Sequence, residues 1–249
     1  MIDASRVDFI AVPVEDLARA EQFYGETLGL ARNPNTSGER WVEYETGNLT
    51  LGLSTFGGGI ALRVPDVEAA RAELEQAGVE FSMDTFDSGV CHGAPFTDPD
   101  GNRLLLHRRY ATSETWDAPA TDVQRTDFLS ITVTDKPRAV EFYGGTLGLS
   151  RDELAHDDWP EFAGENVGMV LSTPEQTNQR ESTPSAFSIA LRVPDVAPSM
   201  ERLKAAAVEF GFDEVYDTGV CQMAFFKDLD GNALMLHHRY APYADGSAP

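Results

Sequence analysis

The chain of 249 residues contains only two cysteines, Cys91 and Cys221. They occupy equivalent places in two similar stretches, "DSGVCHGAPFTDPDGNRLLLH" and "DTGVCQMAFFKDLDGNALMLH". Equivalent positions of repeated domains rarely lie within reach of a disulfide bond. The shortage of cysteine therefore excludes a disulfide-stapled fold and predicts two reduced thiols, the usual state in a cytosolic protein.

Long apolar segments and basic charge are also lacking. No apolar run approaches the roughly 18–20 residues that span a bilayer, and the starting segment MIDASRVDF has no apolar signal core. There are 19 basic and 41 acidic residues, which give a net charge of −22 and repel nucleic-acid phosphates and anionic membranes. We therefore expect a cytoplasmic protein with no nucleic-acid and no membrane partner.

What the sequence does contain is a long internal repeat. The segment "DFIAVPVEDLARAEQFYGETLGLAR" at Asp8–Arg32 is matched by "DFLSITVTDKPRAVEFYGGTLGLSR" at Asp127–Arg151. "IALRVPDV" occurs at Ile60 and again at Ile189, and the cysteine-containing stretch follows each time. The chain therefore consists of two homologous halves.

The domain boundaries follow from this repeat. Residues 1–112 form the first domain and residues 125–249 the second, which ends in a flexible C-terminal tail. A polar segment without periodicity, 113–124, is the expected linker. The extra residues of the second domain fall in the polar loop "TPEQTNQRESTPSA", Thr173–Ala186.

Each half repeats a smaller plan. A short apolar strand leads to an aspartate suited to cap a helix, and an Ala/Arg-rich helix and further short strands follow. The four capping residues are Asp16, Asp66, Asp135 and Asp195. We therefore predict an α+β protein with four strand–helix–strands modules, two in each half.

The turns "DPDGN" and "DLDGN", which start at Asp98 and Asp228, have some likeness to a calcium loop. A calcium loop needs its glycine at the sixth position and additional oxygen ligands. Here the glycine follows the second aspartate directly and lies between two strands, which predicts a hairpin turn.

These motifs together resemble the vicinal oxygen chelate superfamily, the glyoxalase, bleomycin-resistance and extradiol-dioxygenase group. The resemblance depends on "VEDLARAEQFYGETLGL", "VTDKPRAVEFYGGTLGL" and the two Asp-x-Asp-Gly-Asn turns, and it covers nearly the whole chain outside the linker and tail. It implies βαβββ modules paired in two tandem halves, each with curved mixed sheets enclosing one cup.

The resemblance also implies a divalent metal held by His and Glu side chains. This sequence has apolar or small residues at the matching positions, namely Phe9, Gly59, Leu105, Phe128, Ser188 and Met235. The segments Asn48–Leu53 and Asn166–Leu171, in which another Glu would lie, contain no acid and no histidine. Apolar side chains cannot bind such a cation, so no metal and no other cofactor is expected.

Strand alternation then predicts which side chains face the cups. The expected linings are apolar with an arginine and a histidine near the edge, as in many small-molecule pockets. Alternatively, the arginines and histidines lie on the outer surface, and the tryptophans pack in the core. The candidate ligand-binding residues are Phe9, Trp41, Arg63, Cys91, Leu105, His107, Phe128, Trp159, Arg192, Cys221, Met223, Met235 and His237.

The two cysteines lie on strands with two apolar faces, so alternation leaves their orientation open; the resemblance favours the cup side. A small buried hydrophobe is one interpretation of each cysteine and a nucleophile the other. His92 follows Cys91 directly and points away from it on a regular strand. The apolar surroundings predict a raised thiol pKa and slow reaction with thiol reagents.

Two functions remain in competition. The first is metal-independent binding of a small apolar or aromatic molecule in the cups, with drug or metabolite sequestration as the biological role. The second is a metal-independent lyase- or isomerase-type enzyme that uses Cys, His or Arg. A metal-dependent glyoxalase or dioxygenase is disfavoured. The sequence leaves open whether the protein is an enzyme, assigns no catalytic residue, and predicts a monomer or a homodimer with a small-molecule ligand.

Overall fold

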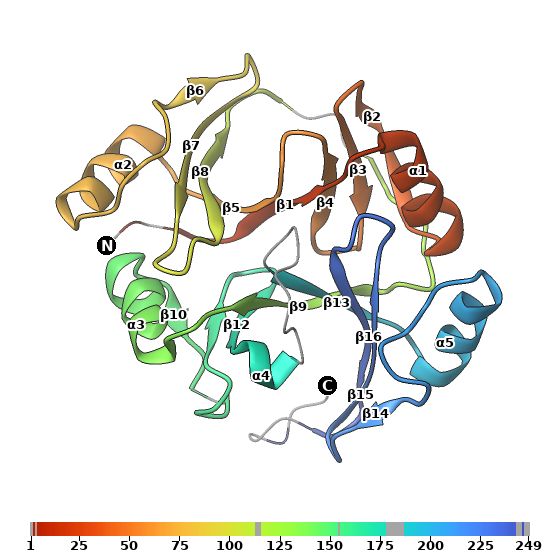
Figure 1. The fold of residues 1–249 in the computed structure, drawn as a ribbon. Coiled ribbons are helices and arrows are strands. Elements are labelled where there is room, and N and C mark those ends of the chain that lie inside the picture. Colours follow the sequence, from red (N-terminus) through yellow and green to blue (C-terminus); the bar gives the residue numbers. More distant parts are fainter. Residues whose placement is uncertain are drawn as a thin grey trace.

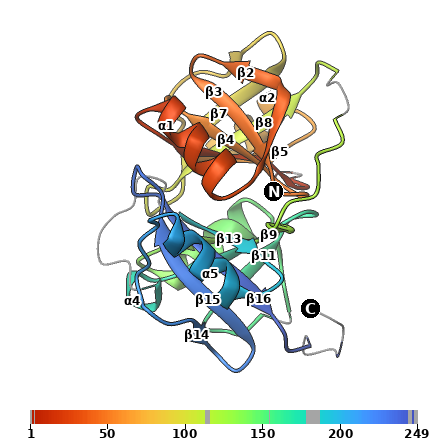
Figure 2. The ribbon, with the colours of Figure 1, turned by 90° about the vertical axis from the view of Figure 1, so that its right-hand side faces the viewer.

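The computed structural model describes residues 2, 4–112, 116–153, 155–177, 187–242 and 246. They form two sheets of eight strands, ordered β2-β3-β4-β1-β5-β8-β7-β6 and β10-β11-β12-β9-β13-β16-β15-β14. The halves are stacked on each other, with the first half above the second in Figure 1 and Figure 2.

The elements of the first half are β1 (Val7–Pro13), α1 (Leu17–Glu21), the π-helical segment η1 (Gln22–Thr27), β2 (Ala31–Gly38), β3 (Trp41–Glu45), β4 (Thr50–Ser54), β5 (Gly59–Arg63), α2 (Val67–Gln76), β6 (Phe86–Asp87), β7 (Cys91–Thr97) and β8 (Arg103–Arg109). Those of the second half are β9 (Arg125–Thr132), α3 (Lys136–Val140), η2 (Glu141–Thr146), β10 (Ser150–Arg151), β11 (Glu161–Ala163), β12 (Gly168–Ser172), α4 (Pro174–Thr177), β13 (Phe187–Arg192), α5 (Val196–Ala205), β14 (Tyr216–Asp217), β15 (Cys221–Lys227) and β16 (Ala233–Arg239).

The order of elements confirms the four βαβββ modules. The first and last strands of a module are parallel neighbours, as in β1–β4 and β13–β16. The two modules of a half join through antiparallel pairs, β1–β5 and β9–β13. Each half is therefore one continuous mixed sheet, and the helices α1, α2, α3 and α5 lie on the outer, convex side of their sheets (Figure 1).

The predicted helix starts are confirmed at all four aspartates, because each side chain accepts a hydrogen bond from a backbone N–H of the first turn. α1 and α3 each continue as a π-helical segment that carries a Phe-Tyr pair. Both residues of each pair are buried: Phe23 and Tyr24 in one half, Phe142 and Tyr143 in the other.

The predicted strand faces are also confirmed by burial. On β1, Ile10 and Val12 are fully buried against the helices, while Phe9 and Ala11 on the other face are half-buried. The strands β2, β6, β10 and β14 were not predicted. β6, β10 and β14 have only two residues each, and β2 contains Pro34 among polar residues, so neither length nor alternation marks them.

The two Asp-x-Asp-Gly-Asn segments are hairpin turns, as predicted, and they also join the halves. Gly101 takes a positive φ of 87°, and Asp98 Oδ1 accepts hydrogen bonds from the N–H groups of Asp100 and Asn102. Asp98 Oδ2 accepts a hydrogen bond from the hydroxyl of Tyr143, in the other half, at 3.0 Å. Asn102 Nδ2 donates to Thr132 O at 2.9 Å.

The second turn makes the reciprocal contacts. Tyr24 donates to Asp228 Oδ2 at 2.8 Å, and Asn232 Nδ2 donates to Pro13 O at 2.7 Å. Burial raises the pKa of Tyr24 well above its ordinary value, so the hydroxyl stays protonated and remains a donor. The motif therefore recurs because each copy docks on the Phe-Tyr segment of the opposite half.

A second polar contact joins the halves at the strand ends. Asn48 Nδ2 donates to Thr126 O at 2.8 Å and to Asn166 O at 2.7 Å. Asn166 Nδ2 in turn donates to Asn48 O and to Val7 O, both at 2.9 Å. These half-buried amides and the two turns fix the orientation of one half on the other.

The structure describes the linker, the inserted loop and the C-terminal tail only in part. β8 ends at Arg109 and β9 begins at Arg125; within the linker, residues 113–115 lie outside the described residues. So do residues 178–186 of the inserted loop and all of the expected flexible tail after Pro242 except Gly246. Within the described ranges, no helix is long and apolar enough to cross a membrane.

Candidate functional site

The concave face of the first half carries a row of rings. Phe9 on β1 contacts Trp41 on β3 and His107 on β8, edge to face, with ring centroids 5.3 and 5.1 Å apart. A side chain at Gly52 would overlap the Trp41 ring, which lies flat over this glycine. The structure thus brings three of the predicted cup residues, from both modules, onto one wall.

A cluster of polar side chains lies at the end of this row. Cys91 is opposite Arg109, and Gly93 is opposite His107, in the antiparallel pair β7–β8. Cys91 and His107 are therefore diagonal neighbours on one face of the sheet. His107 Nδ1 lies 2.6 Å from Asp8 Oδ2 on β1. Cys91 thus shares a face of the sheet with His107, and the register assembles Cys91, His107 and Asp8.

Asp8 reaches the cluster through a β-bulge. Val7 pairs with Leu62, and Phe9 pairs with Ala61, so β1 has one more residue than β5 at this point. Regular alternation would place Asp8 on the helix side, opposite Phe9. The extra residue turns Asp8 to the same side as Phe9, as bulges do next to functional sites.

Arg63 completes the cluster at its outer edge. Its Nε lies 2.6 Å from Asp8 Oδ1, and its side chain is 48% exposed. Asp8 is 6% exposed and thus lies between two cations, Arg63 on one oxygen and His107 on the other. Arg63 is therefore at the rim, as predicted, but it is paired with a carboxylate of its own chain.

The second half repeats this arrangement. His237 Nδ1 lies 2.5 Å from Asp127 Oδ2, and Arg192 Nε lies 2.7 Å from Asp127 Oδ1. The bulge recurs, because Leu191 pairs with Thr126 and Ala190 with Phe128. Cys221 lies diagonally from His237, as Cys91 does from His107. The Phe128 and His237 rings are in edge-to-face contact at 5.2 Å.

The electrostatics of the cluster favour an imidazolium and lower the pKa of the neighbouring thiol. Burial lowers the pKa of His107, but its hydrogen bonds with Asp8 and Cys91 outweigh this and raise the pKa to about 9. Burial raises the pKa of the Cys91 thiol, but hydrogen bonding with His107 and Ser88 lowers it by more. The pKa values of His237 and Cys221 shift in the same directions for the same reasons. The raised thiol pKa expected from the apolar strand is therefore wrong.

The two cups differ in detail. In the first half the ring of Phe86 lies over Gly93, and a side chain at position 93 would overlap this ring. The equivalent of Gly93 is Met223, which pairs with His237 on β16. Leu105 is half-buried, whereas Met235, its equivalent, is buried.

Trp159 does not repeat the position of Trp41. It lies outside the strands and is 40% exposed, with Lys136 Nζ 5.5 Å from the ring centroid. The reason is the shorter β11, which begins two residues later and leaves Trp159 in a bend. Its predicted place on the wall of the second cup is thus not supported by the structure.

Sequence reasoning missed Asp8, Asp127, Glu43 and Glu161. The repeated "DF" was a signal for the two aspartates, but the bulge that orients them was not visible. Glu43 accepts a hydrogen bond from Trp41 Nε1 at 2.9 Å. Glu161 is on the concave face, and its burial raises its pKa. Only strand register shows that these carboxylates face the cups.

The positions implied for metal ligands do not suit a metal. Phe9 and Leu105, two of these positions, flank Ala61 in register on the concave face, and none of the three side chains carries a donor atom. The carboxylate and imidazole nearby are bonded to each other. Within the described ranges, no group of three or more His, Cys, Asp or Glu side chains has the arrangement of a metal site. We derive no chemical step through a metal.

We expect purified protein to contain no stoichiometric zinc, nickel, iron or manganese, because none of the implied ligand positions carries a His, Cys, Asp or Glu side chain. Elemental analysis after expression in metal-supplemented medium measures this directly. About one equivalent of a single metal per half, retained through dialysis against a chelator, would contradict the expectation.

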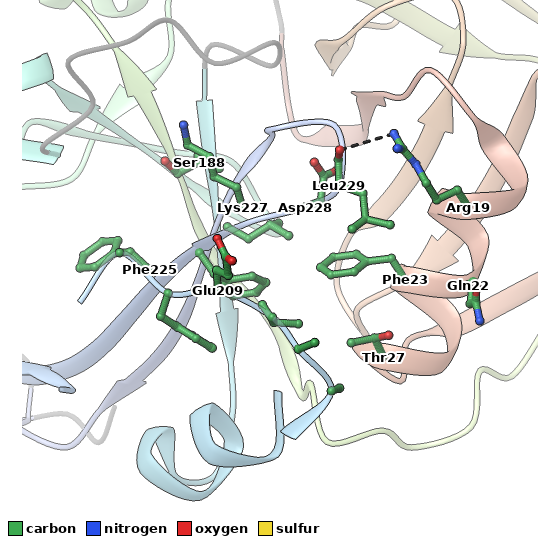
Figure 3. Close-up of a pocket in the computed structure, with 18 of the residues that line it drawn as sticks. Arg19, Gln22, Phe23, Thr27, Ser188, Glu209, Phe225, Lys227, Asp228 and Leu229 are labelled. Carbon is green, nitrogen blue, oxygen red and sulfur yellow. Dashed lines mark hydrogen bonds between the residues drawn. The ribbon is translucent and has the colours of Figure 1, made fainter. Parts of the chain in front are cut away.

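A cavity of about 680 Å³ lies elsewhere, between the halves (Figure 3). Phe23 and Thr27 of η1 line one side, and Phe225 and Glu209 of the second half line the other. Arg19 spans its edge to the carbonyl of Leu229, at 3.4 Å. Its described lining contains no residue of either Cys-His-Asp cluster, so the cavity and the clusters are separate features.

Comparison with known proteins agrees with this architecture. Residues 6–106 and 125–236 both match the Glyoxalase/Bleomycin resistance protein/Dioxygenase superfamily. The chain therefore belongs to this superfamily, in a form with two tandem halves. No curated protein matches the chain.

Solved structures show the same fold at low identity. The Mn(II)-bound glyoxalase from Novosphingobium aromaticivorans has a TM-score of 0.67 at 15% identity, covering 95% of this chain and 83% of that one. The 2,3-dioxygenase LapB from Pseudomonas sp. KL28 has a TM-score of 0.66 at 14% identity, covering 100% and 98%. Homoprotocatechuate 2,3-dioxygenase from Brevibacterium fuscum has 0.67 at 16% identity, covering 96% and 81%. At such identities the likeness shows the fold alone.

Proposed function

We propose that each half binds one small apolar or aromatic molecule in its cup without a metal, and that the biological role is sequestration of a drug or metabolite. One observation carries this proposal: the row Trp41, Phe9 and His107 leads directly into the buried cluster around Asp8. An apolar wall with few polar groups at one end is the usual form of a small-molecule site.

The cluster also defines the expected ligand. Around the carboxylate of Asp8 lie the imidazole of His107 and the guanidinium groups of Arg63 and Arg6, so positive charge is in excess at this end of the cup. A carboxylate or phenolate at the polar end of the ligand compensates this charge, and Arg63 offers it a planar donor. The net charge of −22 acts mainly beyond the screening length of about 8–10 Å. We infer a flat apolar ligand with one weakly acidic group.

The expected result concerns the two rim arginines. Replacing both Arg63 and Arg192 by alanine should weaken binding of aromatic acids by about 5–150-fold, which corresponds to about 1–3 kcal/mol for a charge-assisted hydrogen bond. Isothermal titration calorimetry, after a thermal-shift screen of aromatic acids, measures the change. The matched control is Arg32→Ala, since Arg32 pairs with Glu21 of α1, at 2.7 Å. Equal affinities in wild type and double variant would contradict the role of the arginines.

A second candidate function, a metal-independent enzyme of the lyase or isomerase type, is favoured by a different observation. Cys, His and Asp side chains meet in the same geometry in both halves. A thiol with a neighbouring imidazole, itself held by a third group, is the arrangement of an activated nucleophile.

A further inference from the structure

We propose that Cys91 and Cys221 are nucleophiles that form covalent adducts with aromatic α,β-unsaturated carbonyl compounds held in the cups. This inference rests on the proposed function, because the aromatic ring of the electrophile would occupy the wall beside Phe9. It goes further by assigning a reaction to the cluster and a chemical class to its ligand.

The position of the thiol is the first argument. Cys91 is half-buried at the start of β7, on the same face as His107, whose ring is in contact with that of Phe9. A ligand whose ring packs on Phe9 has its polar end at the cluster. The half-buried thiol is thus within reach of such a ligand, and the same holds for Cys221, which shares a face with His237 and, through it, adjoins Phe128.

The charges around the thiol are the second argument. Arg109 lies directly opposite Cys91 in the strand register, and Arg239 lies opposite Cys221. Each thiol therefore has an arginine and a histidine on the neighbouring strand. The hydroxyls of Ser88 and Thr218 lie 3.1 and 3.4 Å from the respective sulfur atoms. Positive, partly exposed surroundings of this kind favour the thiolate, which is the reactive form.

The backbone around the thiol favours conjugate addition over acyl transfer. Acyl transfer needs donors directed at a developing oxyanion, and the N–H of the nucleophile commonly supplies one. The N–H of Cys91 instead donates to Ser88 Oγ at 3.1 Å, and that of Cys221 to Thr218 Oγ1 at 3.0 Å. Conjugate addition needs only a donor that protonates the α-carbon of the enolate formed in the reaction.

The reaction balances within the cluster. The thiol proton resides on the imidazole, and the thiolate sulfur forms a bond to the β-carbon of the electrophile. The electron pair of the carbon–carbon double bond moves to give an enolate. The imidazolium then returns the proton to the α-carbon. All atoms of both partners remain in the adduct, with no leaving group and no oxidant, and Asp8 holds the imidazolium during the process.

The test uses 4-phenylbut-3-en-2-one as the electrophile and 4-phenylbutan-2-one, which lacks the double bond, as its unreactive counterpart. Intact-mass spectrometry should show addition of up to two probe masses to wild type and one to Cys91→Ser or Cys221→Ser. The rate should saturate with probe concentration, and the saturated ketone should slow it competitively. Within Cys221→Ser, the change His107→Gln should reduce the rate at least tenfold.

The outcomes separate this inference from the proposed function. If calorimetry detects binding of the saturated ketone but the enone forms no adduct, the covalent step is wrong and binding in the cups stands. If adducts form at a rate linear in concentration, unaffected by the saturated ketone, the thiols react as ordinary surface groups and the inference fails. If neither ketone nor any aromatic acid binds, both proposals are wrong.

Discussion

In the Asp98→Ala variant we expect the free energy of unfolding to fall by about 2–4 kcal/mol, because the Asp98 carboxylate accepts four hydrogen bonds. It accepts hydrogen bonds from Tyr143 of the other half, from the Asn102 amide and from two backbone N–H groups. Tyr143 and Asn102 are buried, and each buried donor left without a partner costs about 1–3 kcal/mol. For a chain of this length the midpoint of thermal unfolding should fall by about 4–16 °C.

Chemical denaturation of wild type and variant measures the difference. Tyr143→Phe removes one donor and leaves the carboxylate its other three, so it should cost only about 1 kcal/mol. Asp84→Ala is the control for lost negative charge, since Asp84 is exposed. If Asp98→Ala is no less stable than Asp84→Ala, the turn does not hold the halves together.

Asp8→Asn should slow alkylation of Cys91 by iodoacetamide about tenfold at pH 7. Asp8 raises the pKa of His107, which is about 9, so the imidazolium persists beside the thiol at neutral pH. An amide lacks the charge that favours this imidazolium, so the pKa of His107 falls towards its ordinary value of about 6.5. The thiol then loses its cationic neighbour near pH 7 and its own pKa rises.

The measurement is the rate of alkylation as a function of pH in a Cys221→Ser background. Wild-type Cys91 should react with an inflection at lower pH than an ordinary thiol, and Asp8→Asn should move the inflection to higher pH. A purely structural role of Asp8 would change the rate without moving the inflection. Asp84→Asn is the matched control for charge. An unchanged profile would show that Asp8 does not tune the thiol.

Much of the fold was predictable from local patterns. Each helix start depends on one aspartate and the residues that directly follow it, and each strand face on alternation within a few residues. The repeat then extended these local predictions to the whole chain. The match between burial and expected faces on β1 shows how far such reasoning reaches.

The candidate site was predictable only in part. Phe9, His107 and Arg63 were placed near the cup by alternation, but Asp8 required a bulge, which depends on pairing with a distant strand. The pKa of Cys91 was predicted to be raised, which is wrong. The apolar neighbours along β7 can be read from the sequence, whereas His107 and Arg109 lie on the adjacent strand β8 and become neighbours only through strand pairing. The turn at Asp98 was identified, but its partner Tyr143 lies in the other half.

The reciprocal contacts of the two turns are those of an isologous dimer fused into one chain. Separate subunits would associate according to their concentration, whereas the connection from Arg109 to Arg125 keeps the partners together at any dilution. A substitution in a homodimer also alters both copies of a contact at once. Here it alters one, and the copies already differ. Asp100 and Asp230 each accept from a backbone N–H, that of Thr134 and that of Glu15, but Asp100 also accepts from the Thr134 hydroxyl.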